Sequence, residues 1–298
     1  MKVVQSLMKH LCKSITFDTL SRSSAQRRPQ RHVAGTLVLT VLLLSNIGCS
    51  QSPQLPASSG EALAAAPVIP ASTRQLVIVV SDDWGASTGR LYLFARSVGM
   101  PWQVAGPASA VDLGRNGSAW GLGLHPPQQG QQKQEGDGKA PAGLFRLSSA
   151  FGALPTLVTP MPYQQMSRFD YCIDVPTSPL YNQTLDVRQY RPEWTAGSSE
   201  PMRRDLMATP DAVYQQGLFI DHNFSDGEAR QTGAGSCIFL HQKAANGRKT
   251  AGCTALDPAA LSALLRWLDP QNAPLYLLLP VAEYRRLQQD WQLPVLAE

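Results

Sequence analysis

The stretch GSCIFLHQKAANGRKTAGCTALDPAALSALL, residues 235–265, contains most of what the sequence says about fold and chemistry. It begins with CIFLH at 237–241, a short apolar run typical of a buried strand. A polar loop with an Asn246-Gly247 turn follows, and then Thr250-Ala251-Gly252-Cys253. We therefore expect a cysteine presented at a glycine turn, directly before a helix.

The end of the stretch predicts that helix over 258–268. Asp257 is a good N-cap, and Pro258 suits the first helical position. The apolar side chains on one face are Leu261, Leu264, Leu265 and Leu268. A second helix is predicted over 282–291.

Short β signals surround this stretch. They lie at 76–80, 90–95, 143–147, 217–220 and 275–279, separated by clusters of Gly, Pro, Asn and Asp. The predicted fold class is therefore mostly β with a few short helices. The long loop over 181–207 is expected to pack over this domain or to form a lid.

The N-terminal segment has the composition of an export signal. Seven basic side chains and a single acid lie within the first 32 residues, and the next 16, VAGTLVLTVLLLSNIG at 33–48, are uncharged. Because this run is short for a membrane span, a signal peptide over 1–48 is favoured over an anchoring helix. We expect an exported protein in the periplasm or cell envelope.

The segment after the leader predicts a tether. Residues 49–73 are rich in Pro, Ala and Ser without apolar periodicity, and a folded domain is expected over 74–298. The run Asn46-Ile47-Gly48-Cys49 resembles a lipobox without its usual Leu, so Cys49 is a candidate for lipidation. The alternative is a cysteine by chance at the end of an ordinary signal. Lipidation would be the only membrane attachment expected.

The charge of the body excludes one class of partner. Removing the leader from the totals of 26 basic and 22 acidic residues leaves 19 and 21, because 26 − 7 = 19 and 22 − 1 = 21. A near-neutral body does not predict a nucleic-acid partner.

Cys253 and His241 are the candidate nucleophile and base. The backbone N–H groups of residues 251–253, which are Ala251, Gly252 and Cys253, can converge on a developing oxyanion. Nearby cations, Lys243, Arg248 and Lys249, together with His241, would favour the thiolate. The alternative is that Cys253 is a small buried apolar residue, the commoner fate of a lone cysteine.

Two further cysteines remain in the body. Cys237 is expected on the same strand as His241, where four residues span about 13 Å, too far for the two side chains to pair. Cys172 and Cys237 are candidates for a disulfide in an oxidising compartment. Two reduced core thiols are the equally weighted alternative. Either way, Cys253 is free.

Other chemistry has weaker support. No CxxC, no HExxH and no pair of histidines at helical spacing occurs, so neither a metal nor another cofactor is expected. His125 and His222 lie at turns and are interpreted as surface or hydrogen-bonded histidines. The acids Asp170, Asp174 and Asp221 lack the pairing of a two-carboxylate hydrolase.

Two stretches resemble the YkuD-domain L,D-transpeptidases. EGDGKAPAGLFRL at 135–147 is similar to the family's Asp-Gly-x-x-Pro-x-Gly-x-Phe signature, and CIFLH with TAGC is similar to its catalytic pair. The likeness extends from about Leu76 to Leu279. It implies a β-sandwich with the active-site cleft at one edge, and the peptide stem of peptidoglycan as substrate.

The resemblance also assigns roles. Cys253 would attack the carbonyl before the terminal D-Ala of a donor stem, with His241 as base and the backbone carbonyl of Gln242 orienting the imidazole. An acceptor amine would then take the acyl group, giving a cross-link or an attached wall lipoprotein. Water in its place would give hydrolysis.

The chain departs from the family motif at two places. Ala251 stands where the motif has a second His, and Thr254-Ala255-Leu256 replaces the Arg that follows the Cys. These departures indicate a divergent branch. Lys249, Arg248 or Arg115 are candidates to supply the missing positive charge to the substrate. The two alternative functions are a cysteine hydrolase of stem peptides or wall-linked proteins, and a wall-binding module without turnover.

Overall fold

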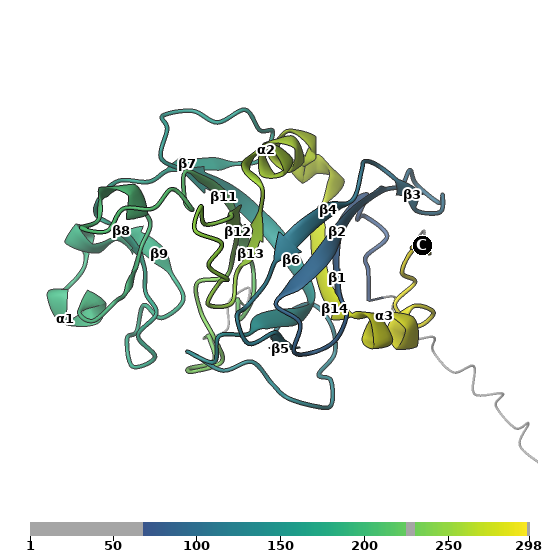
Figure 1. Ribbon diagram of the computed structural model, residues 1–298, viewed down its shortest axis with the longest axis horizontal. Helices are drawn as coiled ribbons and strands as arrows, with labels where there is room; N and C mark the ends of the chain where they lie inside the picture. Colours follow the sequence, from purple (N-terminus) through teal and green to yellow (C-terminus); the bar gives the residue numbers. More distant parts are fainter. Residues whose placement is uncertain (1–67, 225–229, 297–298) are drawn as a thin grey trace, which may run out of the picture. The chain divides into compact units, whose positions relative to one another are not determined.

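The computed structural model describes residues 68–224 and 230–296, and Figure 1 shows how their elements are arranged. The predicted signal peptide, Cys49 and the tether up to residue 67 lie outside the described residues. The last residues of the predicted tether pack on the domain, because Ile69 is 3% exposed and the Arg96 side chain donates to the backbone oxygens of Pro70 and Thr73. None of the helices in the described ranges is long and apolar enough to cross a bilayer.

Fourteen strands and three α-helices make up the described part of the chain. The strands are β1 Gln75–Ser81, β2 Thr88–Ala95, β3 Gln103–Val104, β4 Ser109–Asp112, β5 Ser118–Trp120, β6 Ala140–Gly152, β7 Tyr163–Gln165, β8 Asp170–Cys172, β9 Thr184–Asp186, β10 Glu200–Pro201, β11 Gln216–Ile220, β12 Phe239–Gln242, β13 Thr254–Leu256 and β14 Leu275–Pro280. The α-helices are α1 Pro192–Thr195, α2 Pro258–Trp267 and α3 Val281–Leu287. Short 3-10 helices are η1 Val187–Gln189, η2 Arg204–Leu206 and η3 Pro270–Asn272.

The larger sheet closes on itself. Its strands follow the order β1-β14-β6-β11-β12-β13-β4-β2, and β2 also pairs with β1. The prediction of a mostly β domain with a few short helices is confirmed. A sandwich is not confirmed, because the pairing of β2 with both β1 and β4 joins eight strands into a barrel. Closing the ring leaves no unpaired edge between these eight strands.

The barrel core is built from the apolar runs that the sequence marks. β1 and β14 run parallel, Leu76 opposite Leu275, and nearly every side chain in both is buried. Two helices cover strands of the barrel. Helix α3 packs against β14 and β1, and α2 packs against β11 and β12. Strands buried on both faces lose the polar alternation of an exposed strand, which explains their continuous apolar sequences.

The predicted helices are present, with small differences. α2 follows Asp257 and Pro258 as expected, although the Asp257 side chain makes no capping hydrogen bond. Its buried face consists of Leu261, Leu264 and Leu265. The second predicted helix is α3, which begins at Val281 and ends at Leu287, four residues earlier than expected.

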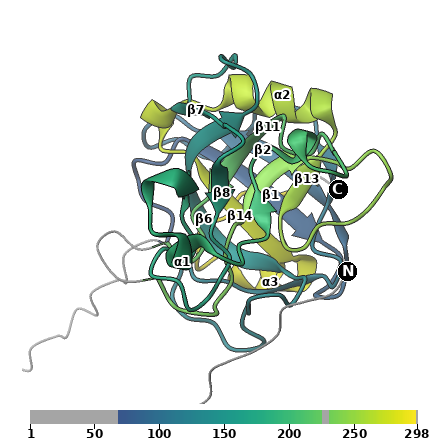
Figure 2. The same ribbon diagram turned by 90° about the vertical axis from the view of Figure 1, so that its left-hand side faces the viewer.

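The segment predicted as a long loop has regular structure of its own. It contains β9, η1, α1, β10 and η2, and its strands complete a three-stranded sheet in the order β10-β8-β9. We call this three-stranded unit the small sheet. Figure 2 shows α1 and β8 in front of the barrel strands when the molecule is viewed from that side. The sequence does not predict these strands, because each is only two or three residues long and so too short for a periodic pattern of apolar residues.

Candidate active site

A tight turn presents Cys253. The Thr250 hydroxyl donates to the Cys253 carbonyl oxygen at 2.6 Å and accepts from the Gly252 N–H at 3.2 Å, which closes the turn. Gly252 has φ +156°, and a Cβ there would lie 2.9 Å from the Lys139 carbonyl oxygen. A side chain at this position would therefore displace the backbone that leads to Cys253. The expectation of a helix directly after Cys253 was wrong, since β13 intervenes before α2.

The thiol of Cys253 is buried and held by backbone groups. Cys253 is 7% exposed, and among the described residues it is the cysteine that forms no disulfide. The Phe239 N–H donates to Sγ at 3.4 Å, and the thiol donates to the Cys237 carbonyl oxygen at 3.4 Å. Phe239 is the first residue of β12 and Cys237 lies two residues before it, so the segment that leads into the strand of His241 also positions the thiol.

His241 lies on β12, which pairs with β13, the strand that begins directly after Cys253. Its Nδ1–H donates to the Gln242 carbonyl oxygen at 2.7 Å, the arrangement that the family resemblance implies. This bond leaves Nε2 as the nitrogen able to accept a proton. His241 pairs with Ala255 of β13, and Cys253 precedes Ala255 by two residues, so both side chains point to the same face. Both line one cavity of about 350 Å³.

Burial sets the protonation of the pair. Desolvation raises the pKa of the Cys253 thiol to about 12, and the Glu200 carboxylate adds to this shift. Desolvation lowers the pKa of His241 to about 4, against a smaller opposing effect of its bond to Gln242. Both shifts favour the neutral thiol and the neutral imidazole at rest. The basic loop therefore does not produce the resting thiolate that the sequence suggested.

Two further residues, Glu200 and Tyr214, line the same cavity as Cys253. The Tyr214 ring packs edge-on against the His241 ring, with centroids 5.2 Å apart. Glu200 belongs to β10 and also contacts Arg204 at 3.5 Å. No motif or spacing marks positions 200 and 214, because their approach to Cys253 depends on how the small sheet packs.

Lys133 was also missed. Its side chain is 4% exposed, and Nζ donates to Asp137 and to the Gln134 carbonyl oxygen, each at 2.7 Å. Lys133 lines the cavity beside Gly252, and its charge lowers the pKa of Cys253. Its partner Asp137 is the first residue of the Asp-Gly signature, so the spacing of four between them was the available signal.

The cations proposed to bind substrate all line the cavity. Lys249 is paired with Asp112 at 2.6 Å, and Arg248 contacts Asp211 at 3.2 Å. Arg115 makes no ion pair with any residue in the described ranges, so it is the most available of the three candidates. Of the predicted oxyanion donors, the Gly252 N–H is bonded to Thr250, which leaves the amides of Ala251 and Cys253 as candidates.

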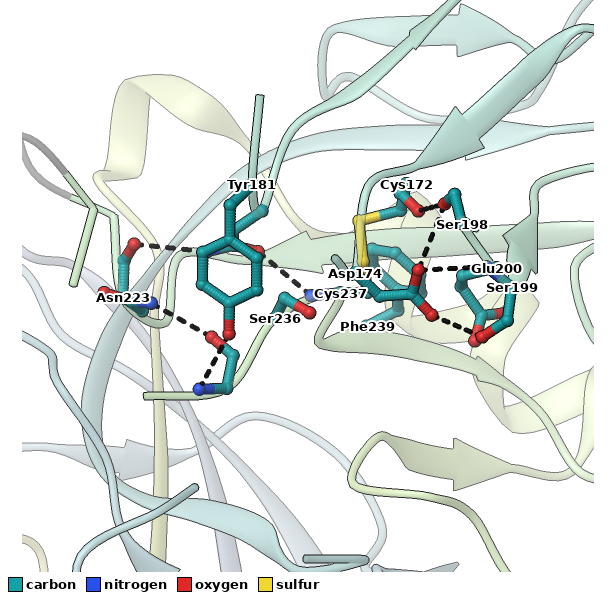
Figure 3. Close-up of a disulfide and its surroundings, with 12 residues drawn as sticks. Cys172, Asp174, Tyr181, Ser198, Ser199, Glu200, Asn223, Ser236, Cys237 and Phe239 are labelled. Atoms are coloured by element: carbon teal, nitrogen blue, oxygen red, sulfur yellow. Dashed lines mark hydrogen bonds between the residues drawn. A yellow bond between two sulfur atoms is a disulfide. The ribbon is translucent and has the colours of Figure 1, made fainter. Parts of the chain in front are cut away.

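Cys172 and Cys237 form a disulfide (Figure 3). The bond joins β8 of the small sheet to the residue two before β12. The expectation that Cys237 lies on the strand of His241 was wrong, because Cys237 has φ +57°, a left-handed conformation that ends the strand pairing. Its N–H donates to the Asn182 side chain instead of to a neighbouring strand.

The two other histidines among the described residues, His125 and His222, are buried. His222 is 2% exposed, accepts from the Leu122 N–H and donates to the Ala234 carbonyl oxygen. His125 is buried too, with its ring 5.5 Å from the Trp291 ring and beneath Gly143. The interpretation of His222 as a hydrogen-bonded histidine fits these contacts, whereas a surface position for either residue does not.

Comparison with known proteins gives no family assignment. No protein-family model, curated protein or solved structure matches the chain. In the described part of the chain, no group of three or more His, Cys, Asp or Glu side chains is arranged to hold a metal ion. The function therefore has to be argued from the site.

Proposed function

We propose that the chain is an exported cysteine acyltransferase of the L,D-transpeptidase type, acting on peptidoglycan stem peptides. The proposal includes the family's fold and its edge cleft, the signal peptide and a periplasmic or cell-envelope location. One observation carries it. A buried thiol and an imidazole whose Nδ1 is bonded to the next backbone carbonyl line the same cavity, next to the Asp-Gly signature.

The neutral resting pair defines the first step. Cys253 Sγ bonds to the carbonyl carbon of the donor peptide, and its proton passes to His241 Nε2 as the bond forms. Concerted transfer follows from the raised pKa of the thiol and the lowered pKa of the imidazole, since neither ion is favoured before attack. The carbonyl oxygen becomes an oxyanion within reach of the Ala251 and Cys253 amides.

Collapse of this intermediate breaks the peptide C–N bond. His241 returns the proton to the departing amine, and the acyl group remains on Sγ as a thioester. An acceptor amine then attacks the thioester and gives up a proton to His241, which passes it to the leaving thiolate. The acceptor belongs to a second stem peptide or to a wall-attached lipoprotein. Arg115 is the cation best placed to bind a donor carboxylate, because Lys249 and Arg248 already have acidic partners.

Intact-protein mass spectrometry tests the proposal. The full chain and its Cys253→Ala variant are incubated with purified tetrapeptide muropeptides and, separately, with a β-lactam acylating agent. We expect an adduct on the wild type and none on the variant. Dimeric muropeptides support transfer, and tripeptides alone indicate the hydrolase instead. Absence of adduct and product with every donor contradicts the enzymatic proposal and leaves the wall-binding module.

A further inference from the structure

A second groove lies on the side of the barrel away from the small sheet. Its walls are the turn between β2 and β3, the start of the described chain and the segment after α3, and its volume is about 660 Å³. Figure 1 shows β3 and α3 on one side of the barrel, and β8 and β9 of the small sheet on the other. The groove is therefore separate from the cavity of Cys253, and the proposed chemistry does not use it.

Three large apolar side chains at this groove face solvent. Val98, Met100 and Val295 are 75%, 54% and 80% exposed, and we call them the apolar rim. Val98 and Met100 belong to a tight turn in which the Met100 N–H donates to the Ser97 carbonyl oxygen at 3.1 Å and Gly99 has φ +72°. Turns of this kind usually carry polar residues at their exposed positions. Exposed apolar side chains gathered at one place indicate an interaction surface.

The charge around the groove has one sign. The segments that form its walls, 68–75, 95–107 and 291–296, contain Arg74 and Arg96 and no acidic residue. Arg96 lines the groove, and its guanidinium carbon lies 4.2 Å from the centre of the half-buried Trp102 ring. An apolar surface with arginine and tryptophan beside it suits the headgroup region of an anionic bilayer. A second copy of this chain would instead bring positive groups against each other.

The predicted tether joins the domain at this groove. Ile69 is 3% exposed, and Ala71 lines the groove. The Arg96 side chain donates to the carbonyl oxygens of Pro70 at 2.9 Å and Thr73 at 2.8 Å, which fixes the chain at this point. A leader or lipid upstream of these residues would therefore hold this side of the domain toward the membrane.

We propose that the groove and its apolar rim dock on the surface of an anionic lipid bilayer, where the rim enters the boundary between headgroups and acyl chains and Arg96 supplies the positive charge. This inference rests on the export that is part of the proposed function, because export brings the chain to a membrane surface. It uses none of the chemistry of Cys253. Docking would turn the small sheet and the cavity beside it away from the bilayer, toward the stem peptides.

Photolabelling from within the bilayer tests the inference. The full chain is mixed with vesicles of phosphatidylethanolamine and phosphatidylglycerol that contain a phospholipid with a diazirine on its acyl chain. Light expels nitrogen from the diazirine, and the carbene inserts into a bond of whatever has entered the bilayer. Tryptic peptides are then quantified by mass spectrometry, so that label on the leader is counted separately. Peptide 97–115 contains Val98 and Met100, and peptide 147–168 contains Val158, which is 75% exposed as Val98 is.

We expect peptide 97–115 to carry at least about tenfold more label than peptide 147–168. The double variant Val98→Ser with Met100→Ser should lose about tenfold of the label on 97–115, because its turn no longer buries apolar surface in the bilayer. Val158→Ser is the matched control and should leave that label unchanged. Replacing phosphatidylglycerol by phosphatidylcholine should lower the label about fivefold, the contribution of one arginine near an anionic surface.

Two results would overturn the inference. One is equal labelling of peptides 97–115 and 147–168, and the other is a double variant that keeps both its melting temperature and the wild-type label. Sedimentation without vesicles examines the other occupant: a dimer that the double variant dissociates, together with an unlabelled rim, would assign the groove to a second copy instead. A chain that is labelled at 97–115 but forms no adduct with stem peptides refutes the proposed enzyme and keeps the inference, and an adduct without label does the reverse.

Discussion

The barrel and the small sheet contribute to the same cavity in different ways. The barrel supplies Cys253 and His241, and it holds both through the backbone of paired strands and through main-chain hydrogen bonds. The small sheet supplies two acidic side chains, Glu200 of the two-residue strand β10 and Asp174 of the chain after β8. The thiol and the imidazole are thus held by the barrel, whereas the small sheet adds acidic groups to the wall of the same cavity.

The two regions also differ in what stabilises them. The barrel has an extensive apolar core that includes β1, β14 and α2, whereas the small sheet buries chiefly Ile173, Leu180 and Leu185 against each other. A cluster of three residues cannot by itself offset the chain entropy of the 32 residues from Asp170 to Pro201. Its attachment to the barrel, and the Cys172–Cys237 bond in particular, is therefore part of its stability.

The largest effect should separate the roles of the two regions. His241→Gln removes the base from the barrel, and we expect acylation of Cys253 by a stem peptide to slow by about 10³-fold. Asp174→Asn, in the chain after β8, should slow it by less than about tenfold, since nothing there receives the proton. Single-turnover adduct formation measured by mass spectrometry compares them. Equal losses in the two variants would contradict the division of roles.

Removing the Cys172–Cys237 disulfide breaks the covalent link between the small sheet and the barrel. The double variant Cys172→Ala with Cys237→Ala should lose about 2–4 kcal/mol of unfolding free energy, because the bond closes a segment with a sequence separation of 65. Urea unfolding followed by fluorescence and by circular dichroism measures the loss. We expect two transitions in the variant, with the small sheet unfolding first. One transition at the wild-type midpoint would show that the barrel holds the sheet without the bond.

Acid should destabilise the barrel before the small sheet. Burial lowers the pKa of His222 and of His241 to about 4 from the ordinary value of 6.5. Between these values the unfolded chain binds more protons, so unfolding free energy falls as pH decreases through this window. For His222, 2% exposed, the loss at about pH 5 is roughly 2 kcal/mol. The difference between urea midpoints at about pH 7 and about pH 5 should therefore be smaller in His222→Asn than in the wild type, because only His241 then contributes, and an unchanged difference would exclude His222 as a source.

The smallest effects should come from the cations around the cavity. Lys249→Ala removes a pair with Asp112 whose partners are 33% and 13% exposed, and we expect less than about 1 kcal/mol of lost stability. Arg115→Ala should leave stability unchanged and raise the donor KM severalfold, more than Lys249→Ala or Arg248→Ala does. Thermal melts measure the change in stability, and initial rates over a range of donor concentrations measure the change in KM. A larger KM change for Lys249 than for Arg115 would reverse the assignment.

Much of the barrel is readable from the sequence. The six apolar runs predicted as strands fall on β1, β2, β6, β11, β12 and β14, and the capped helix falls on α2. These segments are predictable because burial imposes a local pattern of apolar residues. The closure into a barrel is not, since it depends on β2 pairing with both β1 and β4, a contact between edges that leaves no mark in either strand.

The candidate site divides in the same way. By itself the sequence marked Cys253, His241 and the turn between them as the candidate site, because the thiol, the imidazole and the glycine lie on one continuous segment. Only the tertiary structure decided that Glu200, Tyr214 and Lys133 line the same cavity as the thiol and that Cys172 bonds to Cys237. The physical reason is that charge acts through space: segments distant in the chain meet at Cys253, and local pattern carries no record of such an approach.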